Sequence, residues 1–261
     1  MDRLYTKPNP EIEEIEIKKR PVAIKPIASS NQFFEGVDPL YTKSDAFQYP
    51  KAYTVVFSGG TRREDDYFKM ISSEKRFPKF KFEFLSEPNF NANHEPRLFQ
   101  FAYQKVTLYK SSETEECPDS YYIISDVDHF YTHLVANKER CQQMGIQLIV
   151  SNPCFEVWLY YSKNTDKFVG FTPPEDLLKL SKAVKAWYNK DGKIQTTMAI
   201  LDIEQNIENA KMNYCENSDN LPDLYSTNMH VFASEILPYI KDEIDKMIEH
   251  NRISREKFCS V

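Results

Sequence analysis

The feature that most constrains the fold of this 261-residue chain is an alternation of strand and helix patterns between residues 52 and 161. Apolar runs or strict apolar–polar alternation predict four strands, over 53–57, 79–85, 121–125 and 146–150. Apolar residues at helical spacing predict four helices. A short one begins near Glu64, and the other three cover 95–110, 129–144 and 153–161. The β-branched residues of 95–110 leave a strand there as an alternative. The alternation predicts an α/β fold, in which right-handed crossovers join the parallel strands of one sheet and helices flank it.

The two ends of the chain differ from this middle region. Residues 1–50 contain six of the fifteen prolines and show no sustained period, which predicts an irregular N-terminal arm. Helical periodicity returns near the C-terminus, over 174–189, 196–213 and 227–253. We therefore predict three parts: the arm over 1–50, an α/β domain over 51–172, and a C-terminal helical extension over 173–261 that packs on the core.

Composition and charge narrow the classes of function. The net charge of −6 argues against bulk electrostatic binding of nucleic acid, although a local basic cluster would escape that argument. No run approaches the roughly 20 apolar residues of a membrane span, and the residues after Met1 do not form a secretory signal. The five cysteines are odd in number and contain no C-x-x-C pair, so we expect reduced thiols in a cytoplasmic protein.

Polar motifs follow three of the predicted strands, at the carboxyl ends where such sheets bind ligands. They are Ser58-Gly59-Gly60-Thr61-Arg62-Arg63-Glu64, Ser125-Asp126-Val127-Asp128-His129 and Ser151-Asn152-Pro153-Cys154-Phe155-Glu156. Asp126 and Asp128 are one residue apart on an extended segment, so both carboxylates can face one way and offer hard oxygen ligands to Mg²⁺. The alternative is that these aspartates cap the helix that begins near His129. The third motif also fits a helix start, with Asn152 as N-cap and Pro153 at the first helical position.

Basic residues gather in two places. Arg62 and Arg63 follow the first strand, and the helical pattern over 174–189 and the residues just after it carry Lys179, Lys182, Lys185 and Lys190. Beside the aspartates, these side chains would form a phosphate-binding groove within an acidic protein. The alternative is an ordinary solvated helix face.

The run Asp126-Val127-Asp128, followed at its distance by Ser151-Asn152-Pro153-Cys154-Phe155-Glu156-Val157-Trp158-Leu159, resembles the RloB family over about residues 52–240. Proteins of this family are similar to Toprim-domain proteins, so the resemblance implies a Toprim-like, Rossmann-like sheet. It also implies metal-dependent cleavage of phosphodiester bonds in DNA or RNA, with tRNA among the candidate substrates. The family setting is phage defence by restriction and abortive infection, beside a partner ATPase of the RloA type.

Carried over by position, the resemblance implies that Asp126 and Asp128 bind Mg²⁺ or Mn²⁺. Two further acids, Glu64 and Glu156, match catalytic-site elements of the family. The cleft would be formed by Gly59, Gly60, Ser151 and Asn152, and nucleic acid would be bound by Arg62, Arg63, Lys179, Lys182, Lys185 and Lys190. The sequence leaves homo-oligomerisation open.

The chain departs from the family's first motif, E-G-x-x-T-E-x-x-Y-F, at two positions. Gly59 stands where the motif has its leading glutamate, and Arg63 replaces the threonine before Glu64. Losing a general acid or base typically lowers a rate by about 10²–10⁴-fold. Two hypotheses follow: a Mg²⁺-dependent nuclease in which another acid substitutes, or a degenerate Toprim scaffold that binds nucleic acid or the partner ATPase without cutting.

Overall fold

The computed structural model describes residues 52–73, 75–89, 97–112, 117–128, 130–168, 177–192 and 194–259. All of these residues belong to one compact unit of the chain. The predicted arm over 1–50 and the predicted boundary at 172 lie outside the described residues, and both stay predictions.

Four parallel strands form one sheet in the order β2-β1-β3-β4. The strands are β1 (Ala52–Ser58), β2 (Phe80–Ser86), β3 (Ser120–Asp126) and β4 (Ile146–Ser151). Every residue of β1 is buried, because helices cover both faces of a parallel sheet and leave no polar side for water. The predicted α/β class and the four predicted strands are confirmed.

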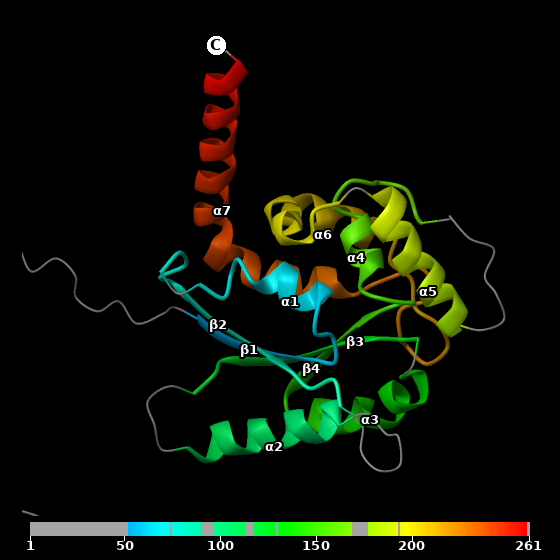
Figure 1. Cartoon of the computed structure of the whole chain (residues 1–261). Coiled ribbons are helices and arrows are strands. Elements are labelled where there is room, and N and C mark those ends of the chain that lie inside the picture. The colour runs from blue at the N-terminus through cyan, green and yellow to red at the C-terminus, as the bar shows by residue number, and fades with distance from the viewer. Residues whose placement is uncertain are drawn as a thin grey trace, which may run out of the picture. The chain divides into compact units, whose positions relative to one another are not determined.

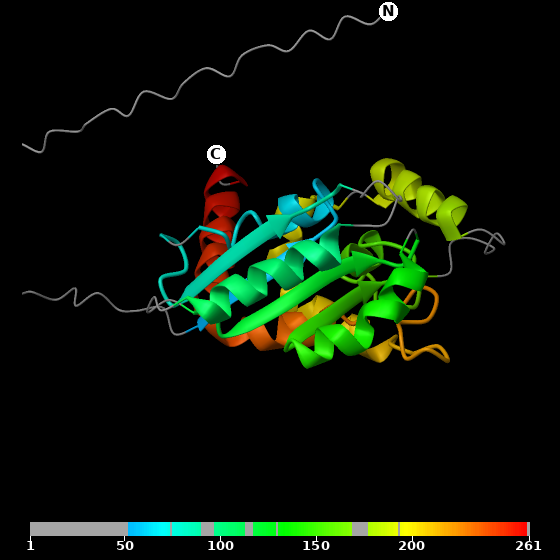
Figure 2. The same cartoon turned by 90° about the horizontal axis from the view of Figure 1, so that it is seen from below.

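Helices form a layer on each face of the sheet (Figure 1). One layer consists of α2 (Leu98–Ser111) and α3 (Tyr131–Gln143), which lie in front of the sheet in Figure 2 and run roughly along its strands. Val55 points into this layer and Val56 into the opposite one, as the twofold alternation of a strand requires. The helix predicted over 95–110 is confirmed against its strand alternative.

The opposite layer combines short helices with the C-terminal extension. It contains α1 (Arg63–Phe68), α4 (Glu156–Tyr160), α5 (Leu177–Trp187), a π-helical turn (Tyr188–Gly192), a 3₁₀ helix (Thr196–Asp202), α6 (Ile203–Met212) and α7 (Met229–Cys259). Phe232 of α7 is fully buried, and its ring centroid lies 4.8 Å from that of Tyr122 on β3 and 5.6 Å from that of Phe68 on α1. The extension therefore completes the core of this layer.

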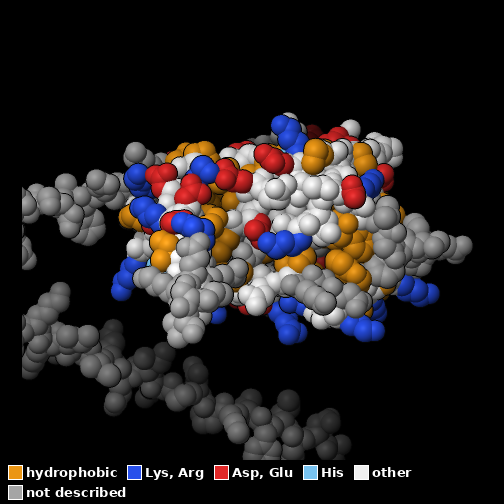
Figure 3. Space-filling view, turned by 90° about the horizontal axis from the view of Figure 1, so that it is seen from above, with side chains coloured by type: hydrophobic (Ala, Val, Ile, Leu, Met, Phe, Trp, Pro, Cys, Tyr) orange, Lys and Arg blue, Asp and Glu red, His pale blue; other side chains and the backbone are white. Residues whose placement is uncertain are grey.

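The side of the molecule that carries α6 and α7 has a mixed surface of charged and hydrophobic side chains. Figure 3 shows acidic, basic and hydrophobic side chains interspersed on the side of the molecule that carries α6 and α7. Lys241 illustrates this mixing, since its ammonium group is paired with Glu204 at 2.6 Å and with Asp245 at 3.5 Å. Of the helices described, none is both long enough and apolar enough to cross a bilayer.

The prediction that Asn152 caps a helix starting at Pro153 is wrong. The Asn152–Pro153 peptide is cis, and α4 begins only at Glu156. The Asn152 N–H donates to the Ser226 carbonyl at 3.0 Å, and its side-chain Nδ2 donates to the Pro222 carbonyl at 2.9 Å. These bonds tie Asn152 to a segment some 70 residues away. The side-chain Oδ1 of Asn152, the atom that would accept a capping bond, has no hydrogen-bond partner among the described residues.

Candidate functional site

A cavity of about 470 Å³ opens at the carboxyl edge of the sheet, beside the ends of β1 and β3. The chain crosses from β1 to β2 on one side of this point and from β3 to β4 on the other. Such a switch point is where open α/β sheets bind their ligands. The fold therefore places the cavity where the sequence motifs predicted chemistry.

The structure brings most of the predicted site residues to this cavity. Its lining includes Gly59, Gly60, Arg62, Arg63, Glu64, Asp126, Asp128, Glu156 and Lys185. Ser151 and Asn152 are buried outside this lining, where Ser151 Oγ bonds Thr227 Oγ1 at 2.8 Å. Lys179, Lys182 and Lys190 are exposed and also lie outside it. The four predicted acids thus line one cavity, whereas three of the predicted phosphate-binding lysines lie outside its lining.

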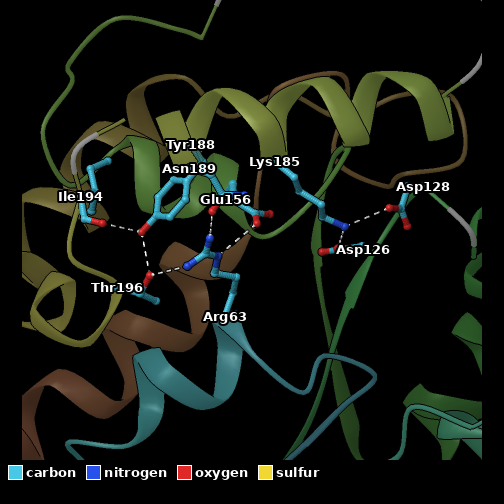
Figure 4. Close-up of polar contacts among 9 residues, drawn as sticks. All are labelled: Arg63, Asp126, Asp128, Glu156, Lys185, Tyr188, Asn189, Ile194 and Thr196. Atoms are coloured by element: carbon cyan, nitrogen blue, oxygen red, sulfur yellow. Dashed lines mark hydrogen bonds and ion pairs between the residues drawn. The ribbon is translucent and has the colours of Figure 1, made fainter. Parts of the chain in front are cut away.

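The two aspartates face one another across a lysine side chain (Figure 4). Lys185 Nζ lies 3.2 Å from Asp126 Oδ2 and 3.2 Å from Asp128 Oδ2. Ser181 Oγ also donates to Asp128 Oδ2, at 2.6 Å. Ser181 and Lys185 are four residues apart, which places both on the same side of α5. One face of α5 therefore supplies both donors to the aspartates.

Backbone pairing fixes the position of the aspartates beyond the end of β3. The Val127 N–H donates to the Ser151 carbonyl at 3.1 Å, and the Asp128 N–H donates to the Pro153 carbonyl at 3.3 Å. The next helix, α3, begins at Tyr131 after an N-cap residue, Phe130, that makes no side-chain capping bond. The alternative in which the aspartates cap this helix is therefore wrong.

Glu64 lies in the first turn of α1 and is only 7% exposed. Its carboxylate rests on Gly60, where an added Cβ would come within 2.0 Å of Glu64 Cδ. Only glycine leaves room for the carboxylate at this place. Burial raises the pKa of Glu64 to about 7, helped by the negative charges of Glu156 and Asp128 and opposed by Lys185. A carboxyl group with this pKa can accept or release a proton near neutral pH.

The raised pKa of Glu64 predicts a pH-dependent gain of stability in Glu64→Gln. The pKa of Glu64 in the folded state, about 7, lies above its ordinary value of 4.5. Above pH 7 the group is ionised in both the folded and the unfolded state, so the cost of burying its charge lowers the free energy of unfolding most in this range. We expect Glu64→Gln to raise the free energy of unfolding by up to about 3 kcal/mol at pH 8. The gain should shrink below pH 7 and disappear near pH 4. Denaturant titrations across this range measure it.

Asp65→Asn is the matched control, because Asp65 is the exposed neighbour of Glu64 on α1. This change should alter the free energy of unfolding by no more than about 0.5 kcal/mol at either pH. A Glu64→Gln gain that is equally large at pH 4 and pH 8 would contradict the assigned ionisation.

The Arg63 guanidinium lies among side chains from three other elements (Figure 4). Its Nε is 3.6 Å from Glu156 Oε1, its Nη2 donates to Asn189, and its Cζ lies 4.6 Å from the ring centroid of Tyr188. Its Nη1 donates to Thr196 Oγ1 at 3.4 Å. Arg63 therefore joins α1 to α4 and to the segment after α5, in addition to lining the cavity.

The structure adds site features that the sequence did not predict. The contacts of Arg63 with Tyr188, Asn189 and Thr196 carried no sequence signal, because they depend on how the turn after α5 folds back. Ser181 and Lys185 carried a weak one, a polar pair at helical spacing. The sequence assigned Lys185 to phosphate, and the structure directs it to the two aspartates.

Mg²⁺ is the ion implied by the resemblance, and the residues present fit it in kind. Within the described parts of the chain, no group of three or more His, Cys, Asp or Glu side chains converges on a common point. Mg²⁺ does not require three, because it keeps several waters and binds through one or two carboxylates together with substrate phosphates. Asp126 and Asp128 both reach one cationic group, so they provide such a pair.

The charge of this pair is strongly influenced by its surroundings. Burial and then the nearby Glu64 raise the pKa of Asp126 well above its ordinary value, while Lys185 lowers it. A positive charge beside Asp126 therefore favours its ionised form. Either the lysine ammonium or a metal ion can provide that charge.

The sheet order, the helices on both faces and the carboxylates at the carboxyl edge define an α/β protein of the Rossmann-like and Toprim-like class. The chain belongs to the RloB-like protein family, whose model matches residues 54–236. This match covers most of the chain and includes every residue of the site. Comparison with curated proteins and with solved structures gives no match.

Proposed function

We propose that this RloB-like protein is a Mg²⁺- or Mn²⁺-dependent nuclease that cleaves phosphodiester bonds of DNA or RNA. The observation that carries the proposal is the convergence of Asp126 and Asp128 on one cation position, in a cavity at the switch point of the sheet. Family membership supports it through the chemistry implied by the resemblance.

Each side chain has a role that follows from its place. Asp126 and Asp128 would hold the ion, which when bound polarises a phosphoryl oxygen. Glu64 would exchange a proton, because its pKa of about 7 suits general acid–base chemistry. The exposed Arg62 at the cavity mouth would contact the scissile strand. Lys179, Lys182 and Lys190, on the outside of α5 and the following turn, would contact backbone phosphates further away.

The test is a cleavage assay on DNA and tRNA with Mg²⁺, Mn²⁺ or EDTA, with and without a partner ATPase of the RloA type. We expect metal-dependent cleavage that falls about 10²-fold or more in Asp126→Asn and Asp128→Asn. Metal should also raise the melting temperature of the wild type but not of Asp126→Asn. Asp65→Asn, an exposed acid outside the cavity lining, is the control. Equal metal shifts in wild type and Asp126→Asn would refute the metal site.

A second candidate function is favoured by Gly59, which leaves the cavity without the leading glutamate of the family motif. On this hypothesis the protein is a degenerate Toprim scaffold that binds nucleic acid or the ATPase without cutting. It predicts binding by gel shift or pull-down and no cleavage under any of the conditions above. Cleavage that Asp128→Asn abolishes would exclude it.

A further inference from the structure

Lys185 occupies the place that a metal ion would take between the aspartates. Its Nζ is equidistant, at 3.2 Å, from one oxygen of Asp126 and one oxygen of Asp128. Mg²⁺ binds carboxylate oxygens at about 2.0–2.1 Å, so an ion and an ammonium group cannot fit between the same two oxygens together. One must leave for the other to enter.

Three features show that this contact is specific to Lys185. The Ser181 hydroxyl anchors the same face of α5 to Asp128 at 2.6 Å, which holds the helix in the register that delivers the lysine. The other basic residues of this segment, Lys179, Lys182 and Lys190, are exposed and point elsewhere. Lys185 Nζ meets one oxygen of each aspartate at the same distance, 3.2 Å, so a single side chain bridges both carboxylates.

The lysine also has a route out of the site. Its side chain is 39% exposed, whereas that of Asp128 is 3% exposed. The aspartates are held by backbone pairing of the residues around them, and the lysine is held by its tip alone among the contacts described. A long side chain of this kind can turn to solvent while the carboxylates stay in place.

We propose that Lys185 is a built-in competitor for the divalent metal ion, which fills the cation position when no metal is bound and must withdraw before metal can enter. The inference deepens the proposed function, because it concerns the ion on which that function depends. In the metal-free protein Lys185 holds the two carboxylates together around its ammonium group. It also weakens apparent metal affinity by the fraction of time that it occupies the site, and an occupancy of about 90% weakens binding about ten-fold.

The test is titration of the full-length protein with Mn²⁺ alone, by calorimetry or by electron paramagnetic resonance of the free ion. We expect Lys185→Gln and Lys185→Met to bind Mn²⁺ about ten-fold more tightly than the wild type. In EDTA both variants should melt at a lower temperature than the wild type, and Mn²⁺ should remove this difference. Two substitutions of different polarity keep the test usable if one of them folds poorly.

Two controls isolate the position of the charge. Lys182→Gln removes the same charge from an exposed site on the same helix, and its Mn²⁺ affinity should stay close to that of the wild type. Lys185→Arg keeps the charge and should not gain affinity as Lys185→Gln does. Unchanged or weaker Mn²⁺ binding in both neutral variants, or no binding in any variant, would overturn the inference.

The outcomes also separate this inference from the proposed function. Tighter Mn²⁺ binding in Lys185→Gln, with no cleavage by any variant, would support the competitor and refute the nuclease. Cleavage by the wild type, with identical Mn²⁺ affinities in wild type and Lys185→Gln, would support the nuclease and refute the competitor.

Discussion

Gly59→Glu should raise the rate of metal-dependent phosphodiester cleavage by about 10²–10⁴-fold, the range typical of one positioned general acid or base. Gly59 lines the cavity just beyond β1, where the resembled motif has its leading glutamate. A Cβ at this position has Leu98 Cδ2 as its near neighbour at 3.8 Å, an ordinary contact, so the backbone tolerates a Cβ there. The measurement is kcat/KM in Mn²⁺ for whichever nucleic acid the wild type cleaves.

Gly59→Gln is the matched control, because glutamine has the length of glutamate without its charge or its proton. It should remain at the wild-type rate. Equal rates for Gly59→Glu and Gly59→Gln, in protein that folds and binds metal, would show that the missing glutamate does not limit the reaction. The neighbouring position cannot serve instead, because a Cβ at Gly60 would displace the carboxylate of Glu64.

Arg63→Met should lower the free energy of unfolding by about 3 kcal/mol. The substitution leaves Glu156, whose side chain is 4% exposed, as a buried charge without its ion-pair partner. Breaking one side of a buried ion pair typically costs about 3–5 kcal/mol, and we expect the lower end because the Arg63 side chain is 22% exposed. Urea denaturation at pH 7 measures the change.

The double variant Arg63→Met/Glu156→Gln tests the cause of this loss. Removing the stranded charge should recover a large part of the stability, since a neutral amide is far cheaper to bury. Arg62→Met, at an exposed arginine next in sequence, should change stability by no more than about 0.5 kcal/mol. A double variant as unstable as Arg63→Met would indicate that Arg63 acts through its packing on Tyr188 instead.

The inner strands could be predicted from the sequence because burial on both faces of the sheet requires a run of residues that all pack well inside the core. Tyr53–Phe57 consists of β-branched and aromatic residues, since β1 is an inner strand of the sheet with a neighbour on each side. The position of Asp126 followed from the same argument, because the carboxyl ends of parallel strands meet at one edge. Both predictions depend only on the residues of a strand and on the direction in which parallel strands run.

The errors and omissions share a different origin. Asn152 was wrongly assigned as a helix cap because the residues that bind it, Pro222 and Ser226, are distant in sequence. The position of Lys185 depends on the rotation of α5 relative to the sheet, which helical periodicity alone does not fix. Contacts between elements therefore had to come from the structure.

The packing of Phe232 determines how far the chain can be shortened without disturbing the cavity. α1 carries both Glu64 and Arg63, and its Phe68 is covered by Phe232 of α7. A shortened chain that ends after α6 would keep every cavity residue and yet expose the underside of the helix that holds two of them. A shortened chain that is to fold with this site intact must therefore include the first turns of α7. The C-terminal helix supports α1 from below although none of its residues lines the cavity.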